Sequence, residues 1–200
     1  MGRPTDPLVA AVAAGGYMAL CRRHRDRPRR VEARAFRAVN DAPDRRWLRL
    51  PQQLGTPWAL PATAAVLAAR GRRAWAAAAL VALPVEKGAE VATKKVLRRP
   101  RPVAVVATVL RDDAPTEGPA QPSGHAAIAA AAAYLLARGT GSRTLGTAGA
   151  LGTVLTSYVR VHQGAHWPGD VAAGAALGVA VGAGLATVVD AGGPRRPEIG

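Results

Sequence analysis

The residues best suited to chemistry are His166 and Asp170, which lie four positions apart in a short turn between two alanine-rich apolar segments. Titratable groups beside an apolar run of membrane length are costly, so they indicate a functional site. A histidine that donates its Nδ1–H to a carboxylate keeps Nε2 free as a nucleophile. Arg160 ends the preceding segment and could bind phosphate oxygens. We predict that His166 attacks phosphorus, Asp170 orients His166, and Arg160 holds the phosphate. A capping aspartate beside a solvated histidine is the simpler alternative.

A second candidate motif, Pro122-Ser-Gly-His125, directly precedes an apolar segment. Ser123 is a favoured helix N-cap, and the first backbone N–H groups of a helix attract anions. Gly124 would allow a phosphate to approach closely, with His125 beside it. The alternative is an ordinary cap followed by an interfacial histidine.

A third candidate motif is the basic run Lys94-Lys-Val-Leu-Arg-Arg-Pro-Arg101-Pro102. Lysine offers a point charge and arginine a two-pronged donor, and both suit phosphate oxygens. By itself this run could equally be a basic patch attracted to anionic lipid headgroups.

Six apolar segments position these motifs, and they predict an all-α integral membrane bundle of about six transmembrane segments. The count falls to five if the first segment, which is short for a span, does not cross. Two crossings separate the loop 94–122 from the loop 160–169, so both loops lie on one face of the membrane and their motifs can meet. Tryptophans at segment ends are typical of interface anchors. The segments are 7–21, 58–69, 74–91, 123–137, 144–159 and 170–189, and the tryptophans are Trp58, Trp75 and Trp167.

The chain is predicted to form a single domain of 200 residues with three parts. Residues 1–55 form a retained N-terminal anchor and a basic interfacial stretch with a helix over 31–40. Residues 56–190 form the helical core that carries the candidate site, and residues 191–200 form a disordered tail. The carboxylates Glu86 and Glu90 share a helical face with Lys94, so we expect a self-neutralising stripe that faces other helices.

The chain is strongly basic, with 27 Lys and Arg against 13 Asp and Glu, a net charge of +14. Nucleic acid, an anionic membrane surface and an anionic substrate could each account for this charge. The basic residues lie between long apolar runs, which favours a membrane protein and argues against nucleic-acid binding. The single cysteine, Cys21, excludes an internal disulfide.

Together the three motifs resemble the signature of the type 2 phosphatidic acid phosphatase (PAP2) family. That signature is Lys-x6-Arg-Pro, then Pro-Ser-Gly-His, then Arg-x5-His-x3-Asp, and all three spacings occur here in order. Two departures are Val159, where the family often has serine, and Gln121, where it often has an aromatic residue. The matching residues are Lys94, Arg101, Pro102, Pro122, Ser123, Gly124, His125, Arg160, His166 and Asp170.

The resemblance implies a metal-independent membrane phosphatase without a cofactor, acting on a lipid phosphate through a phosphohistidine on His166. It implies that Asp170 supports His166 and that His125 protonates the leaving group. The phosphate-binding residues would be Lys94, Arg101, Ser123, Gly124 and Arg160.

The resemblance also implies location in a cell membrane as a multi-pass protein, and the alanine- and arginine-rich composition indicates a bacterial inner membrane. Phosphatidic acid and isoprenyl phosphates or diphosphates are the expected substrate types. The side of the membrane that the site faces and the oligomeric state stay open. A protein that binds anionic lipid without turnover is the main alternative, and a vanadate-dependent oxidase is disfavoured by the membrane-length helices.

Overall fold

The computed structural model describes residues 5–23, 28–112 and 114–192, and these residues form helices and loops without a strand. The all-α prediction is confirmed. Residues 193–200, most of the predicted disordered tail, lie outside the described part. The longer helices are α1 (Thr5–Arg23), α2 (Arg30–Asn40), α4 (Ala59–Ala69), α5 (Arg73–Leu97), α6 (Gly124–Thr140), α7 (Arg143–His162) and α8 (Pro168–Ala191). The short ones are η1 (Arg46–Leu48), α3 (Arg49–Gln52), η2 (Gln53–Gly55) and η3 (Pro102–Ala104).

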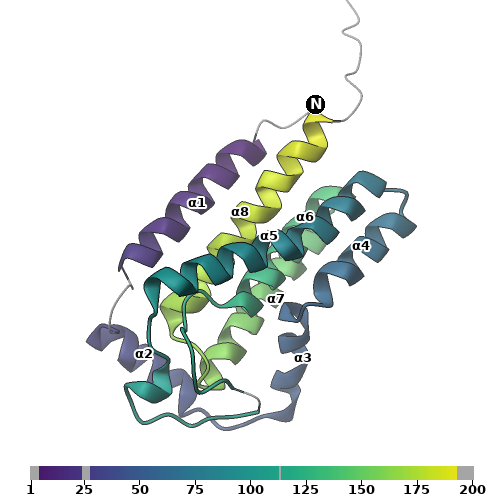
Figure 1. The fold of residues 1–200 in the computed structure, drawn as a ribbon. Coiled ribbons are helices and arrows are strands. Elements are labelled where there is room, and N and C mark those ends of the chain that lie inside the picture. Colours follow the sequence, from purple (N-terminus) through teal and green to yellow (C-terminus); the bar gives the residue numbers. More distant parts are fainter. Residues whose placement is uncertain (1–4, 24–27, 113, 193–200) are drawn as a thin grey trace, which may run out of the picture.

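Helix α6 is the centre of the bundle and contacts α4, α5, α7 and α8, while α1 lies along α8 (Figure 1). The approach of α8 to α6 depends on glycine. A Cβ atom at Gly174 would lie 2.2 Å from the carbonyl oxygen of Ser123, and one at Gly178 would lie 2.1 Å from that of Ala127. Small residues of this kind let helix backbones touch. The same contact brings the start of α8 to the start of α6.

Among the described residues, α8 is the one helix both long and apolar enough to cross a membrane. Helix α4 is apolar but has 11 residues, a rise of about 16 Å at roughly 1.5 Å per residue. Each of the six apolar segments predicted from the sequence does form a helix. The number of transmembrane crossings stays a prediction.

Two expectations drawn from the sequence are wrong. Helix α5 continues to Leu97, so Lys94 lies on its last turns and not in a loop. Trp167 is fully buried, so it is not an interface anchor, whereas Trp58 is 78% exposed. The stripe on α5 is confirmed for Glu90, which pairs with Lys94, but both carboxylate oxygens of Glu86 are buried without a hydrogen bond.

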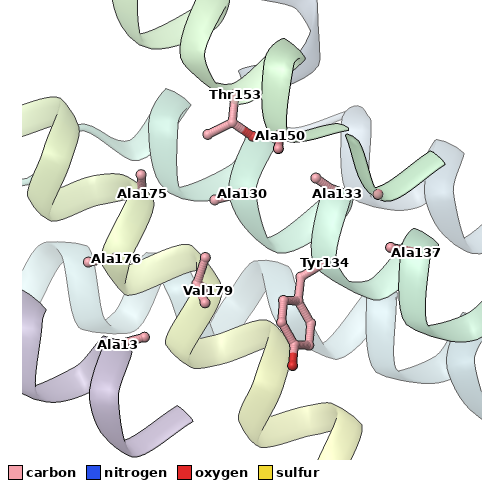
Figure 2. Close-up of a pocket in the computed structure, with 11 residues that line it drawn as sticks. Ala13, Ala130, Ala133, Tyr134, Ala137, Ala150, Thr153, Ala175, Ala176 and Val179 are labelled. Atoms are coloured by element: carbon pink, nitrogen blue, oxygen red, sulfur yellow. The ribbon is translucent and has the colours of Figure 1, made fainter. Parts of the chain in front are cut away.

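Two apolar cavities flank the contact between α6 and α7, and Ala133 and Thr153 line both. The first, of about 460 Å³, is bounded by α1, α6, α7 and α8, with Tyr134 along one side (Figure 2). The second, of about 450 Å³, lies between α4, α6 and α7, and one end is formed by Gln53, Leu54 and Thr56. The bundle therefore has apolar space on both sides of α7.

Candidate active site

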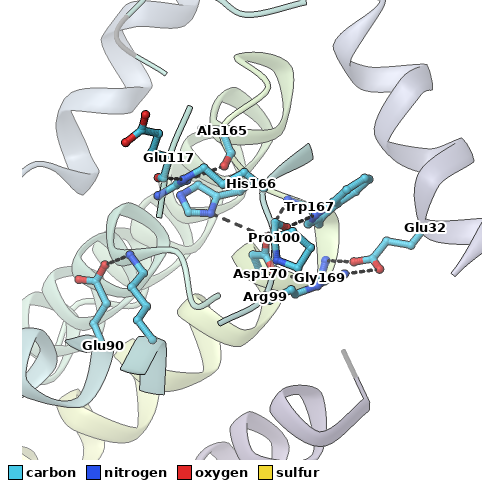
Figure 3. Close-up of polar contacts among 12 residues, drawn as sticks. Glu32, Glu90, Arg99, Pro100, Glu117, Ala165, His166, Trp167, Gly169 and Asp170 are labelled. Carbon is cyan, nitrogen blue, oxygen red and sulfur yellow. Dashed lines mark hydrogen bonds and ion pairs between the residues drawn. The ribbon is translucent and has the colours of Figure 1, made fainter. Parts of the chain in front are cut away.

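The three predicted motifs meet at one end of the bundle. The backbone N–H of Ser123, at the start of α6, donates to the carbonyl oxygen of Asp170 in the first turn of α8, at 3.0 Å. Arg101, which follows α5, donates from Nη1 to the carbonyl oxygen of Ala165 at 2.8 Å. Helix ends distant in sequence thus surround His166 (Figure 3). The loops 94–122 and 160–169 therefore meet in the structure, as the count of membrane crossings predicted.

His166 lies in the turn between α7 and α8 and is almost fully buried. Its Nδ1 is 3.8 Å from Oδ2 of Asp170 and has no hydrogen-bond partner. That distance is too long for the hydrogen bond expected from the sequence, although such bonds often tighten only when substrate binds. Burial lowers the pKa of His166 to about 4, and the neighbouring Asp170 opposes this shift. The imidazole is therefore neutral at pH 7, the state that a nucleophile needs.

Asp170 is fully buried and is held by several donors. Its Oδ2 accepts from the backbone N–H of Trp167 at 2.9 Å, which caps α8. Its Oδ1 accepts from Nη1 of Arg99 at 2.5 Å. Asp170 therefore caps α8, as the simpler alternative expected, but the solvated histidine of that alternative is wrong because His166 is buried. Its carboxylate is fixed before any ligand is present.

Arg99 is a site residue that the sequence did not reveal. It is fully buried and donates from Nη2 to Oε2 of Glu32 at 2.6 Å, while Oε1 of Glu32 accepts from the backbone N–H of Gly169 at 2.9 Å. We call Glu32, Arg99 and Asp170 the carboxylate cluster. It links α2 to the turn that carries His166. The one available clue was that Glu32 and Phe36 share a helical face.

Trp167 explains how α2 reaches this site. Its ring packs against Phe36 of α2 with centroids 5.0 Å apart, and Nε1 donates to the carbonyl oxygen of Pro100 at 2.9 Å. The guanidinium of Arg99 lies 5.9 Å from the ring centroid. The predicted interfacial helix exists, but its buried face covers the candidate site.

We give the name anion pocket to the predicted phosphate-binding residues, Lys94, Arg101, Ser123, Gly124 and Arg160. Arg160 is buried at the end of α7, where Nη1 donates to Oε1 of Gln163 at 2.6 Å and Nε has no partner. Arg101 also donates from Nε to the carbonyl oxygen of Glu117 at 2.7 Å. Burial lowers the pKa of Arg101 from its usual value, and the charges of Asp170 and Glu90 oppose that shift.

The start of α6 completes this pocket. Ser123 occupies the N-cap position as predicted, but its hydroxyl makes no capping bond and is buried without a partner. Lys94 pairs with Glu90 at 2.5 Å, and the Glu90 carboxylate lies against Gly124. His125 is half-buried, and Gly55 of η2 contacts its backbone and Cβ.

His162 lies outside this group, as predicted. It is buried, and its Nε2 is 3.1 Å from the carbonyl oxygen of Ala42. Its role is to join α7 to the loop after α2. Within residues 5–23, 28–112 and 114–192, no three His, Cys, Asp or Glu side chains gather to hold a metal ion.

The family model of the PAP2 superfamily matches residues 73–193, which is more than half of the chain. The chain belongs to the PAP2 superfamily. The match includes every residue of the three motifs, so the prediction of a PAP2-family membrane phosphatase is confirmed. Glu32, the outer member of the carboxylate cluster, lies before the matched range.

Two crystal structures share the fold of this PAP2 protein. One is a transmembrane PAP2-type phosphatidylglycerolphosphate phosphatase from Bacillus subtilis, with 18% identity, a TM-score of 0.71, and coverage of 94% of this chain and 98% of that one. The other is LpxE from Aquifex aeolicus, with 23% identity, a TM-score of 0.64, and coverage of 74% and 90%. No curated protein sequence matches this chain. The similarity extends over nearly the whole of both neighbours.

Proposed function

We propose that this PAP2 protein hydrolyses the phosphomonoester or diphosphate of a membrane lipid, without a metal ion and through a phosphohistidine on His166. The proposal rests on one observation, the unpaired buried polar atoms of the anion pocket beside His166. Ser123 Oγ and Arg160 Nε are buried there without partners. A buried polar atom costs free energy unless it is paired. A phosphoryl group would satisfy both atoms with its oxygens.

The chemistry requires two displacements at phosphorus. In the first, Nε2 of His166 attacks, the ester P–O bond breaks, and His125 gives a proton to the leaving oxygen. In the second, water attacks the phosphohistidine, the P–N bond breaks, His125 accepts the water proton, and orthophosphate leaves. General acid–base catalysis of this type contributes about 10²–10⁴-fold. Asp170 stabilises the imidazolium that forms on His166.

The cations of the anion pocket supply the electrostatic part of the rate enhancement. Arg101 and Arg160 are both buried, so water screens their charges weakly. Phosphoryl transfer depends mainly on positioning and on stabilising charge at the equatorial oxygens. Lysine and arginine side chains can fill the role that a metal ion fills elsewhere. Lys94 joins them once substrate phosphate competes with Glu90.

The second apolar cavity supports a substrate with an apolar chain. It runs beside α6 from Gln53–Thr56 to Val66 and Leu136, and the adjoining Gly55 contacts His125. An acyl or isoprenyl chain fits a cavity of this lining, with its phosphate at the anion pocket. The Bacillus subtilis neighbour, a phosphatidylglycerolphosphate phosphatase, agrees with this class. The proposed substrate is a phosphatidic acid or an isoprenyl phosphate. The proposed enzyme is a multi-pass protein that binds this lipid in the cell membrane.

The direct test is phosphate release from a panel of lipid phosphates by the purified protein in detergent with EDTA. We expect release with chelator present and loss of turnover in His166→Ala. Wild-type enzyme should also form an acid-labile phosphoenzyme with a labelled substrate. Strict dependence on magnesium, or full activity of His166→Ala, would contradict the mechanism.

A matched pair of lysine variants separates site chemistry from general basicity. Lys94→Met should reduce kcat/KM strongly, whereas Lys95→Met, at the exposed neighbouring position, should leave it unchanged. A protein that only binds anionic lipid would bind vesicles of anionic lipid equally well in both variants and release no phosphate from any substrate. That outcome would favour the non-catalytic alternative.

A further inference from the structure

A carboxylate already lies in the anion pocket. Glu90 of α5 is 6% exposed, and its two oxygens accept from two lysines, Lys94 Nζ to Oε1 and Lys87 Nζ to Oε2, each at 2.5 Å. All three residues lie on α5. Figure 3 marks the ion pair of Glu90 with a dashed line. A cation that we assign to the phosphate is therefore bound to an internal anion.

The same carboxylate touches the start of α6. A Cβ atom at Gly124 would lie 2.5 Å from Oε2 of Glu90 and 2.9 Å from its carboxyl carbon. Gly124 is the first residue of α6, and the N–H groups of a first helical turn have no intrahelical partner. Phosphate oxygens bind at such helix ends. Glu90 thus lies against the flank of Gly124, beside the position of a phosphate bound at the start of α6 and at Lys94.

Glu90 also lies within electrostatic range of the other reacting groups. His125 interacts with Glu90 as well as with Arg160, His166 and Lys87. Arg101 interacts with Glu90 and Asp170. Two anions cannot share one cationic pocket in a low-dielectric site without mutual repulsion. A phosphate bound beside Gly124 would therefore be repelled by the Glu90 carboxylate.

We propose that Glu90 is the resident anion of the pocket and a specificity-determining residue. In the free enzyme it holds Lys87 and Lys94 in place, and the substrate phosphate displaces it from Gly124. After hydrolysis its return opposes the binding of orthophosphate, so the product leaves readily. This proposal rests on the proposed function, because it assigns the pocket to phosphate.

The test measures orthophosphate affinity in two ways. The first is the inhibition constant for orthophosphate against hydrolysis of a radiolabelled lipid phosphate, in wild type and Glu90→Gln. The second is direct orthophosphate binding in a His166→Ala background, which requires no turnover. We expect Glu90→Gln to tighten both by about three- to tenfold, a change of roughly 0.6–1.4 kcal/mol. The control is Glu86→Gln, one turn earlier on α5, which should leave both values within twofold of wild type.

Each possible outcome either supports or overturns the proposed role of Glu90. An unchanged or weaker orthophosphate affinity in folded Glu90→Gln, or an equal gain in Glu86→Gln, would overturn the proposal and leave Glu90 as a support for Lys94. If Glu90→Gln fails to fold, Glu90→Asp is judged by the same criterion, because its shorter side chain withdraws the carboxylate from Gly124. Failure of the proposed function is distinct: wild type would then release no phosphate from any lipid of the panel.

Discussion

The carboxylate cluster and the anion pocket lie on two sides of His166 and differ in how their polar groups are satisfied. In the cluster, Arg99 bridges two carboxylates, and Glu32 and Asp170 also accept from the backbone N–H groups of Gly169 and Trp167. In the pocket, Ser123 Oγ and Arg160 Nε are buried without a partner, whereas in the cluster one such atom, Arg99 Nε, is left.

This difference indicates that the cluster supports the turn that carries His166, whereas the pocket is suited to bind a ligand. The cluster is nearly complete without a ligand, so it fixes the turn that carries His166 in advance. In the pocket, Ser123 Oγ and Arg160 Nε are unpaired without a ligand, so under the proposed function these two atoms gain hydrogen bonds when phosphate binds. Preorganised groups of this kind lower the barrier because they need no rearrangement during reaction. We therefore expect mutations of Glu32 and Arg99 to act mainly on stability and mutations in the pocket to act on turnover, whereas Asp170 also takes part in the proposed chemistry.

The largest expected effect comes from Arg99→Met. It leaves the Glu32 and Asp170 carboxylates buried without their shared cation, and breaking a buried pair in this way costs about 3–5 kcal/mol. The free energy of unfolding, from denaturation in mild detergent, measures the loss. Arg98→Met, at the exposed adjacent position, is the control and should remain near wild type. Wild-type stability in Arg99→Met would show that the cluster is not a structural support.

Arg160→Met should show the opposite pattern. It removes a cation from the pocket and leaves the cluster intact, so we expect kcat/KM to fall by about 10²–10³-fold, or roughly 2.7–4 kcal/mol. The free energy of unfolding should change by less than half of the change in Arg99→Met. Arg143→Met, at the exposed far end of α7, is the matched control for activity. A loss of stability without loss of turnover would remove the distinction between the two regions.

The sequence revealed the two regions unequally, and the reason is physical. The pocket residues stand at fixed spacings within short motifs at the ends of apolar segments, and membrane parity brings those ends together. The cluster joins Glu32 to Arg99 across 67 positions, and no local pattern encodes that contact. Arg99 stands in a run of five cations, where spacing identified Lys94 and Arg101 but gave no reason to choose Arg99.

The errors about helix ends have the same origin. Trp167 borders an apolar segment, as interface anchors do, but the fold covers it with Phe36 of α2. Helix α5 continues past its apolar part because Lys87, Glu90 and Lys94 pair along one face. Hydropathy shows which part of a helix is apolar. The end of the helix is set instead by its last backbone hydrogen bonds. The prediction of Lys94 in a loop failed for this reason.

The pH dependence of turnover tests the environment of His166 between the two regions. Burial lowers its pKa to about 4, whereas an ordinary histidine near 6.5 would be about 90% protonated at pH 5.5. We expect kcat/KM to fall less than twofold between pH 7 and pH 5.5, once the second ionisation of the substrate phosphate is measured separately by ³¹P NMR. A tenfold fall that follows an ordinary histidine would contradict a buried, neutral nucleophile.

The smallest effect is expected for Ser123→Ala, and it tests the comparison most closely. The Ser123 hydroxyl is fully buried, makes no capping bond and has no partner, so its removal eliminates an unsatisfied group from the free protein. We therefore expect stability to be unchanged or higher by up to about 1 kcal/mol. Because the hydroxyl would donate to a phosphoryl oxygen, kcat/KM should fall by roughly five- to tenfold. Denaturation and steady-state kinetics on one preparation provide both values, and a loss of stability would show that Ser123 caps α6 in solution and belongs with the structural support.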